Sequence, residues 1–239
     1  MKIDVITVWP MGVDYPLYRR FIRNYRSQFN EVIIAFTKSY NGFDFRPFIK
    51  KTMETCKFMD ALEAPGDWRD LATNVALGGS TGDNILFLEQ DFMILSPTDF
   101  FRAITNPSFD MTCYREGTRL HPAMIRVRSD LVRMTKRDFA TVPDKYDHFW
   151  TFFQDLDNLK IPLEVMILDE ADNKNMFHHL AGFTHNYNLC ISNDLKSLYK
   201  KAEFHEWNQK SIEADVEQEG RWMNVMEMVA KQTSPIALV

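Results

Sequence analysis

Two acidic residues separated by one position, Glu89 and Asp91, are the clearest candidates for chemistry in this sequence. They end an apolar run, and residues 84–94 together predict a buried strand that carries the pair to the carboxyl edge of a sheet, where open α/β sheets bind ligands. Residues i and i+2 of an extended chain point to the same side, so both carboxylates can hold one divalent cation while Gln90 faces away. The alternative is an acidic pair that only caps the next element or solvates a strand end.

The same stretch resembles the Asp-x-Asp motif of nucleotide-sugar glycosyltransferases of the GT-A fold, with Glu in the first acidic position. The resemblance is to inverting, family-two-like members and covers about residues 1–185. It implies a nucleotide-sugar donor as partner and Mn²⁺ or Mg²⁺ as cofactor. Glu89 and Asp91 would hold the cation against the donor diphosphate, and Glu89 would also contact the donor.

Three of the six histidines lie within residues 176–185, and imidazole is a good ligand for Mn²⁺ and Zn²⁺. The resemblance implies that a late histidine completes the metal site. His179, which precedes Leu-Ala-Gly, fits this place best, and His178 is the alternative. A packed or solvated histidine is the purely structural interpretation. A zinc hydrolase is not favoured, because the sequence has no His-Glu-x-x-His spacing.

Residues 150–159 are aromatic and then acidic, and they resemble the segment of inverting GT-A enzymes that opens a helix near the acceptor and supplies the general base. A sugar hydroxyl needs a carboxylate that accepts its proton as the glycosidic bond forms. The resemblance assigns this role to Asp155, with Asp157 as the second choice. The alternative is an amphipathic helix with aromatic residues in the core and solvated aspartates.

Donor contacts follow from the resemblance at the ends of the first two strands and in a later helix. The strand positions are Thr7, Trp9 and Thr37. The helix positions are Arg69, for phosphate, and Asp70 and Asn74, for ribose or sugar hydroxyls. The aspartate that often binds the nucleotide base in this family is missing near Thr37, and a capped surface helix is the alternative interpretation of the second group.

Residues 115–138 hold seven basic and three acidic residues, a local net charge of +4. This segment lies between the acidic pair and the predicted base, where the resemblance implies the acceptor side. Arg115 and Arg119, with Trp150 further along, would line it, and the local charge favours an anionic acceptor. The candidates are a phosphorylated glycan or lipid head group, or DNA with a hydroxymethylated base, whose target base must leave the stack. A solvated helix face with alternating charges is the alternative.

Alternating strand-like and helix-like segments predict an α/β fold whose mostly parallel central sheet is flanked by helices. The resemblance implies that this is the Rossmann-like GT-A fold. The expected strands are residues 3–9, 32–36, 84–94, 110–114 and 123–127. The expected helices follow Pro16, Asp67, Pro97 and Ser129. We predict one glycosyltransferase domain, residues 1–190, and a helical C-terminal extension, residues 191–239, packed on it.

The composition limits the remaining choices. The chain has 239 residues, and its three widely spaced cysteines suit a reducing compartment. Its formal net charge of −5 argues against a surface built wholly for nucleic acid. No apolar segment approaches membrane-spanning length, so we expect a cytoplasmic protein, phage-encoded and active in the host cytoplasm if modified DNA is the acceptor. A nucleotidyltransferase would need a Gly-rich phosphate loop, whereas residues 9–20 contain only Gly12. A non-enzymatic nucleic-acid-binding subunit is the other alternative.

Overall fold

The computed structural model describes residues 1–12, 15–38, 44–62, 68–116, 119–136, 139 and 149–179, which belong to one compact unit, Met1–His179. The predicted helical extension, residues 191–239, lies outside the described residues, so the domain boundary at residue 190 stays a prediction. Within the described part, no helix is long and apolar enough to cross a membrane.

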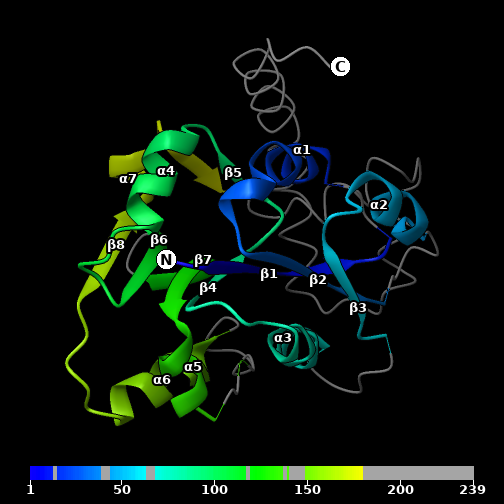
Figure 1. Ribbon diagram of the computed structural model, residues 1–239. Helices are drawn as coiled ribbons and strands as arrows, with labels where there is room; N and C mark the ends of the chain where they lie inside the picture. Colours follow the sequence, from blue (N-terminus) through cyan, green and yellow to red (C-terminus); the bar gives the residue numbers. More distant parts are fainter. Residues whose placement is uncertain are drawn as a thin grey trace, which may run out of the picture. The chain divides into compact units, whose positions relative to one another are not determined.

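A seven-stranded mixed sheet has the strand order β3-β2-β1-β4-β7-β6-β8 (Figure 1). The strands are β1 (Ile3–Pro10), β2 (Glu31–Thr37), β3 (Lys57–Asp60), β4 (Asn84–Leu88), β6 (Met111–Glu116), β7 (Arg119–Arg128) and β8 (Val165–Asp169). Strands β3, β2, β1 and β4 pair in parallel, as do β6 and β8, whereas β7 is antiparallel to β4 and β6. The predicted α/β class with a mostly parallel sheet is confirmed.

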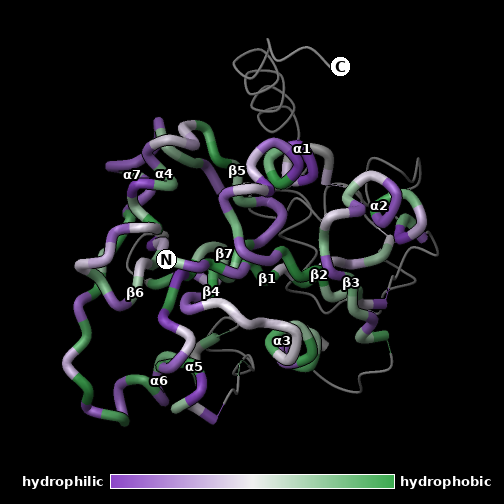
Figure 2. The backbone as a smooth tube through the Cα atoms, in the orientation of Figure 1, coloured by the Kyte–Doolittle hydropathy of each residue, from purple (hydrophilic) through white to green (hydrophobic). Residues whose placement is uncertain are grey.

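Helices cover both faces of this sheet. They are α1 (Pro16–Tyr25), the 3₁₀ helix η1 (Arg26–Gln28), α2 (Arg46–Thr52), α3 (Trp68–Gly78), α4 (Pro97–Ile104), α5 (Ser129–Met134), α6 (Trp150–Asn158) and α7 (Glu170–Asn173). Figure 1 shows α1 and α4 on one face and α3, α5 and α6 on the other. Figure 2 shows hydrophobic and hydrophilic residues mixed around α1, as expected for a helix that buries Ile22 and exposes Arg23.

The predicted continuous strand over residues 84–94 is wrong. Strand β4 ends at Leu88, a turn follows, and β5 (Phe92–Ile94) pairs with β9 (Phe177–His179) in a separate two-stranded sheet. Phe92 N donates to Glu89 O at 3.3 Å, which closes the turn, and the Gln90 amide donates to the Val8 carbonyl. Glu89 and Asp91 therefore lie in a turn between two sheets and not along one strand.

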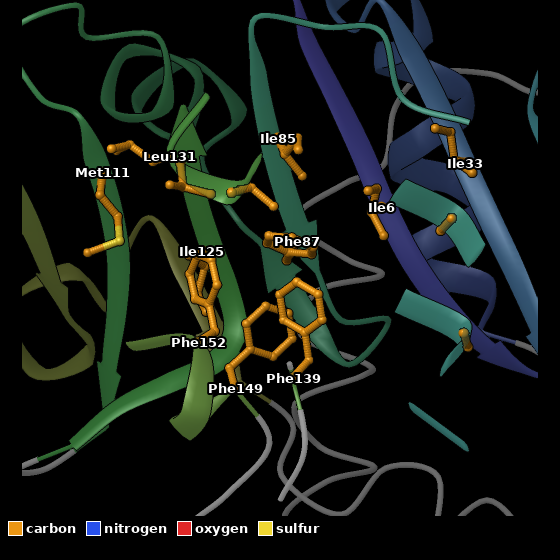
Figure 3. Close-up of a cluster of buried hydrophobic side chains, with 14 of the residues drawn as sticks. Ile6, Ile33, Ile85, Phe87, Met111, Ile125, Leu131, Phe139, Phe149 and Phe152 are labelled. Carbon is orange, nitrogen blue, oxygen red and sulfur yellow. The ribbon is translucent and has the colours of Figure 1, made fainter. Parts of the chain in front are cut away.

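An aromatic core packs under the carboxyl half of β4 (Figure 3). The Phe87 ring lies 4.7 Å from the Phe149 ring and 5.6 Å from the Phe139 ring, centroid to centroid. Phe152 of α6 joins the same cluster and is fully buried. Each such ring contributes roughly 1.5–3 kcal/mol by burial, so the start of α6 is firmly held beside this part of β4.

The amino end of the sheet is held by a buried carboxylate, Asp4. Its Oδ1 accepts from Asn30 Nδ2 at 2.7 Å and its Oδ2 accepts from Ser80 Oγ at 2.8 Å and from Thr81 N and Gly82 N at 2.7 Å each. Burial raises the pKa of Asp4, but these hydrogen bonds outweigh it and the net pKa is lowered. Asp4 thus joins β1 to the start of β2 and to the loop before β4.

Candidate functional site

Three side chains of types that can bind a metal ion meet at the carboxyl end of β4: Glu89, His121 and His179. One potential ligand atom from each lies within 4.8 Å of the others, and both histidines are buried. Glu89 directly follows β4, and its backbone N donates to Ala123 O of β7 at 2.9 Å. His121 is on β7, and the pairing of β9 with β5 places His179 opposite Phe92. Three segments far apart in the sequence therefore converge here.

His179 provides the strongest indication of a ligand site. Its side chain is 4% exposed, its Nε2 lies 3.7 Å from Asp91 Oδ1, and its Nδ1 has no hydrogen-bond partner among the described residues. The two ring nitrogens point in different directions, so a cation shared with Asp91 would lie at Nε2, whereas Nδ1 faces away from that carboxylate. Carboxylate oxygens and an imidazole nitrogen form a donor set that suits Mn²⁺ and related cations, so the residues present fit the implied metal.

His121 was missed by reasoning from the sequence. Its ring centroid lies 4.6 Å from that of His179, and the Tyr114 ring packs edge-on against both histidines. The only signal in the sequence is a histidine near the start of a strand. That signal becomes informative only when β7 is known to pair with β4.

His178 is not brought into this group. Its Nδ1 lies 2.9 Å from Glu170 Oε1, because successive residues of β9 point to opposite sides. Glu170 also accepts from the Tyr114 hydroxyl at 2.6 Å and from His179 N at 3.3 Å. This carboxylate therefore ties β9 to β6 next to the candidate metal ligands.

Two predicted donor-binding residues of β1 belong to the core. Thr7 is 1% exposed, and its hydroxyl bonds with the Tyr18 hydroxyl and donates to Leu88 O at 2.7 Å. Trp9 is fully buried against the rings of Tyr15 and Tyr18. Their side chains hold β1 to β4 and α1. Thr37, at the end of β2, is buried too, and its hydroxyl has no partner within the described part of the chain.

The predicted donor helix begins at Trp68, and its polar residues serve local structure. Asn74 Nδ2 donates to the Asp70 carbonyl at 3.2 Å and to Asp70 Oδ1 at 3.1 Å, and that carboxylate also accepts from Phe139 N at 2.9 Å. Leu71 is 44% exposed, whereas Ala72 is fully buried. The side chains of Arg69, Arg119 and Trp150 lie outside the described part.

The predicted base does not lie with this group. Helix α6 starts beside Phe87, and the chain after it reaches Glu164, whose carbonyl accepts from Asp110 N at the start of β6. The helix therefore runs toward the amino end of β4, and with a rise of about 1.5 Å per residue Asp155 lies about 9 Å beyond Phe149 along it. Asp155 Oδ2 accepts from Lys136 N at 2.9 Å, and Asp157, further on, is exposed.

Much of the basic charge in residues 115–138 is used inside the fold. Arg115 donates to Asp169 Oδ2 through Nε at 2.9 Å, and this bond is the main reason that the pKa of Asp169 is lowered. Arg126 is fully buried, and Arg128 pairs with acidic side chains on both sides of it. The expected basic acceptor surface therefore loses Arg126, while Arg115 stays half-buried and Arg128 exposed, both paired with carboxylates.

No protein-family model matches this sequence, and no curated protein matches it. Several solved structures do match it in fold. Glucosyl-3-phosphoglycerate synthase from Mycobacterium tuberculosis, in complex with Mn²⁺, uridine diphosphate and phosphoglyceric acid, is 12% identical with a TM-score of 0.53, covering 86% of this chain and 80% of that one. The same enzyme with Mg²⁺ and uridine diphosphate is 14% identical, with a TM-score of 0.50 over 74% of this chain and 71% of that one.

A mannosyltransferase from Pyrobaculum calidifontis, in complex with GDP-mannose and Mn²⁺, is 13% identical with a TM-score of 0.48, over 71% of this chain and 55% of that one. Identities this low show the architecture alone. The chain has a GT-A-like fold.

Proposed function

We propose that this chain is a divalent-metal-dependent glycosyltransferase that takes a sugar from a nucleotide-sugar donor. The observation that carries the proposal is the cluster of Glu89, His121 and His179 at the carboxyl end of β4, where Asp91 Oδ1 also lies 3.7 Å from His179 Nε2. Its second support is the GT-A-like fold, in which the similar enzyme from Mycobacterium tuberculosis holds Mn²⁺ and uridine diphosphate.

In this proposal Glu89, Asp91 and His179 would hold Mn²⁺ or Mg²⁺. The bound cation would offset negative charge on the departing nucleoside diphosphate, worth several kcal/mol in a site shielded from water. The chain contributes rigidity. His179 is on β9, which pairs with β5, and its ring packs against the rings of Tyr114 and His121, so it is held in place before a nucleotide-sugar binds. Such preorganisation lowers the cost of binding.

The general base and the acceptor remain predictions. The position of Asp155 and Asp157 on the second half of α6 does not support contact with a sugar hydroxyl beside Glu89. We propose an anionic acceptor. Because the similar enzyme binds phosphoglyceric acid, a small phosphorylated acid joins phosphorylated glycans and hydroxymethylated DNA as a candidate.

Donor binding and hydrolysis across UDP-, GDP- and dTDP-sugars, with Mn²⁺, Mg²⁺ or a chelator, test the proposal. We expect metal-dependent binding of one donor, weakened at least about tenfold in Asp91→Asn because a charged ligand is lost. Asp172→Asn, which alters an exposed aspartate of α7, is the matched control and should bind like the wild type. No binding of any donor, or binding that ignores both the metal and Asp91, would contradict the proposal.

A further inference from the structure

The hydrogen bonding of His121 defines its protonation state. Ala123 N donates to His121 Nδ1 at 3.1 Å within the buried start of β7. A ring nitrogen that accepts a hydrogen bond carries no proton, so the ring is neutral and its proton is on Nε2.

This tautomer is unsuited to metal coordination. The lone pair of Nδ1 is occupied by the Ala123 N–H, and Nε2 carries a proton, so neither nitrogen offers a lone pair to a cation. A histidine that binds a metal shows the opposite arrangement, because its second nitrogen normally donates a proton to a carboxylate or carbonyl. His179 differs from His121, since its Nε2 lies 3.7 Å from Asp91 Oδ1, where that nitrogen could share a cation with the carboxylate.

A protonated Nε2 is, however, a good donor to a carboxylate, and Glu89 is in reach. Atoms of Glu89, His121 and His179 lie within 4.8 Å of one another, and Glu89 N is anchored on Ala123 O, two residues after His121. The ring of His121 is held by Tyr114 and His179 and is 7% exposed. A hydrogen bond in a buried environment of low dielectric constant is stronger than one in water, so it orients its acceptor strongly.

We propose that His121 is a positioning residue whose Nε2–H donates to the carboxylate of Glu89, and that the metal ligands among the described residues are Glu89, Asp91 and His179. The inference rests on the proposed function, because it assigns the residue that orients one ligand of the same centre. Glutamate has one more rotatable bond than aspartate, so a fixed donor beside it limits the conformations that the cation would otherwise have to select.

The tautomer can be measured directly in the metal-free protein. Two-bond ¹H–¹⁵N correlation spectra of histidine-labelled wild type report which nitrogen of each ring is protonated, and the signals absent from His121→Gln identify His121. We expect the proton on Nε2. A proton on Nδ1 would leave Nε2 available for a cation and would overturn the proposal.

The ligand count gives the second test. Electron spin echo measurements on the Mn²⁺-loaded protein should detect one coordinated imidazole nitrogen, lost in His179→Ala and retained in His121→Gln. A second coupled nitrogen that disappears in His121→Gln would make His121 a ligand and overturn the proposal.

A pair of substitutions separates positioning from simple packing. Glutamine can place an N–H near the position of Nε2, whereas phenylalanine keeps an aromatic ring and removes the donor. We expect His121→Phe to weaken Mn²⁺ binding about tenfold, as loss of an outer-shell partner typically does, and His121→Gln to stay within about threefold of the wild type. Equal affinities in all three proteins, or no Mn²⁺ binding by the wild type, would overturn the proposal.

The proposal about His121 and the proposed glycosyltransferase function can fail independently. If Mn²⁺ binds as described but no nucleotide-sugar does, the positioning role stands and the transferase proposal fails. If a donor binds with metal while His121→Phe, shown to be folded by its thermal transition, retains full Mn²⁺ affinity, the positioning role fails and the transferase proposal stands.

Discussion

At the scale of single residues, Asp4 is the clearest determinant of stability. Its carboxylate accepts from a side-chain amide, a hydroxyl and backbone N–H groups of two separate segments, residues 30–31 and 80–82. We expect Asp4→Ala to destabilise the protein by about 3 kcal/mol, because five donors, one of them buried and the others partly buried, lose their acceptor together. Chemical denaturation measures this free energy, and Asp157→Ala, at an exposed position, should change it by less than about 0.5 kcal/mol.

The lowered pKa of Asp4 also predicts a pH dependence. An unfolded aspartate has a pKa of about 3.9, and the pKa of Asp4 in the folded protein is lower. The Asp4 carboxylate therefore contributes its full stabilisation above the unfolded pKa. That stabilisation is lost as the pH falls through the folded pKa. Below pH 4 the thermal unfolding temperature should therefore fall more steeply with pH in the wild type than in Asp4→Asn. Parallel plots of unfolding temperature against pH would contradict the assignment.

Gly82 supports Asp4 by close approach. A Cβ at this position would lie 2.8 Å from Asp4 Cγ and 3.0 Å from Lys2 O. We expect Gly82→Ala to cost about 1–3 kcal/mol, in the range of overpacking. Gly78→Ala is the matched control, because a Cβ added there, at the end of α3, would meet nothing within 4 Å, and a helical alanine should be neutral or slightly stabilising. Equal effects of the two changes would refute the steric account.

At the scale of elements, a buried arginine connects α4 to the sheet. Arg126 of β7 donates to the carbonyls of Ile104, Asn106 and Phe109 at 3.0, 2.9 and 2.7 Å, which satisfies the C-terminal end of the helix. Removing it leaves buried carbonyls unpaired, so we expect Arg126→Met to cost about 3 kcal/mol. Arg128→Met removes only exposed ion pairs and should cost less than about 1 kcal/mol. Urea denaturation distinguishes them.

The short strand β9 depends on Glu170, which contacts both of its histidines and Tyr114. We expect Glu170→Ala to weaken Mn²⁺ binding about tenfold, because β9 loses the anchor that places His179. Asp172→Ala, on the same helix but exposed, should bind like the wild type. Calorimetric titration with Mn²⁺ measures both, and unchanged affinity in Glu170→Ala would show that β5 alone positions His179.

Helices and buried strands were predictable where the local pattern decides the structure. Apolar runs predicted β1, β2 and β4, and Pro16 and Pro97 predicted the starts of α1 and α4. The break after Leu88 was not predictable, because residues 92–94 are as apolar as a continuation of the strand would be. Only their pairing with β9 separates them from β4. His121 was missed for the same reason: its place depends on β7 lying beside β4, which no local pattern encodes.

At the scale of the whole molecule, the domain boundary expected at residue 190 is a prediction that a fragment can test. Among the described residues, one apolar cluster joins α3, α5 and α6 to the sheet within the unit Met1–His179. A fragment of residues 1–190 contains this core and every candidate metal ligand, so we expect it to fold alone and to bind Mn²⁺ with nearly the affinity of the full chain. Circular dichroism should show one cooperative thermal transition. A fragment without such a transition would place the boundary further along the chain, whereas a cooperative fragment that fails to bind Mn²⁺ would mean that residues beyond 190 complete the metal site.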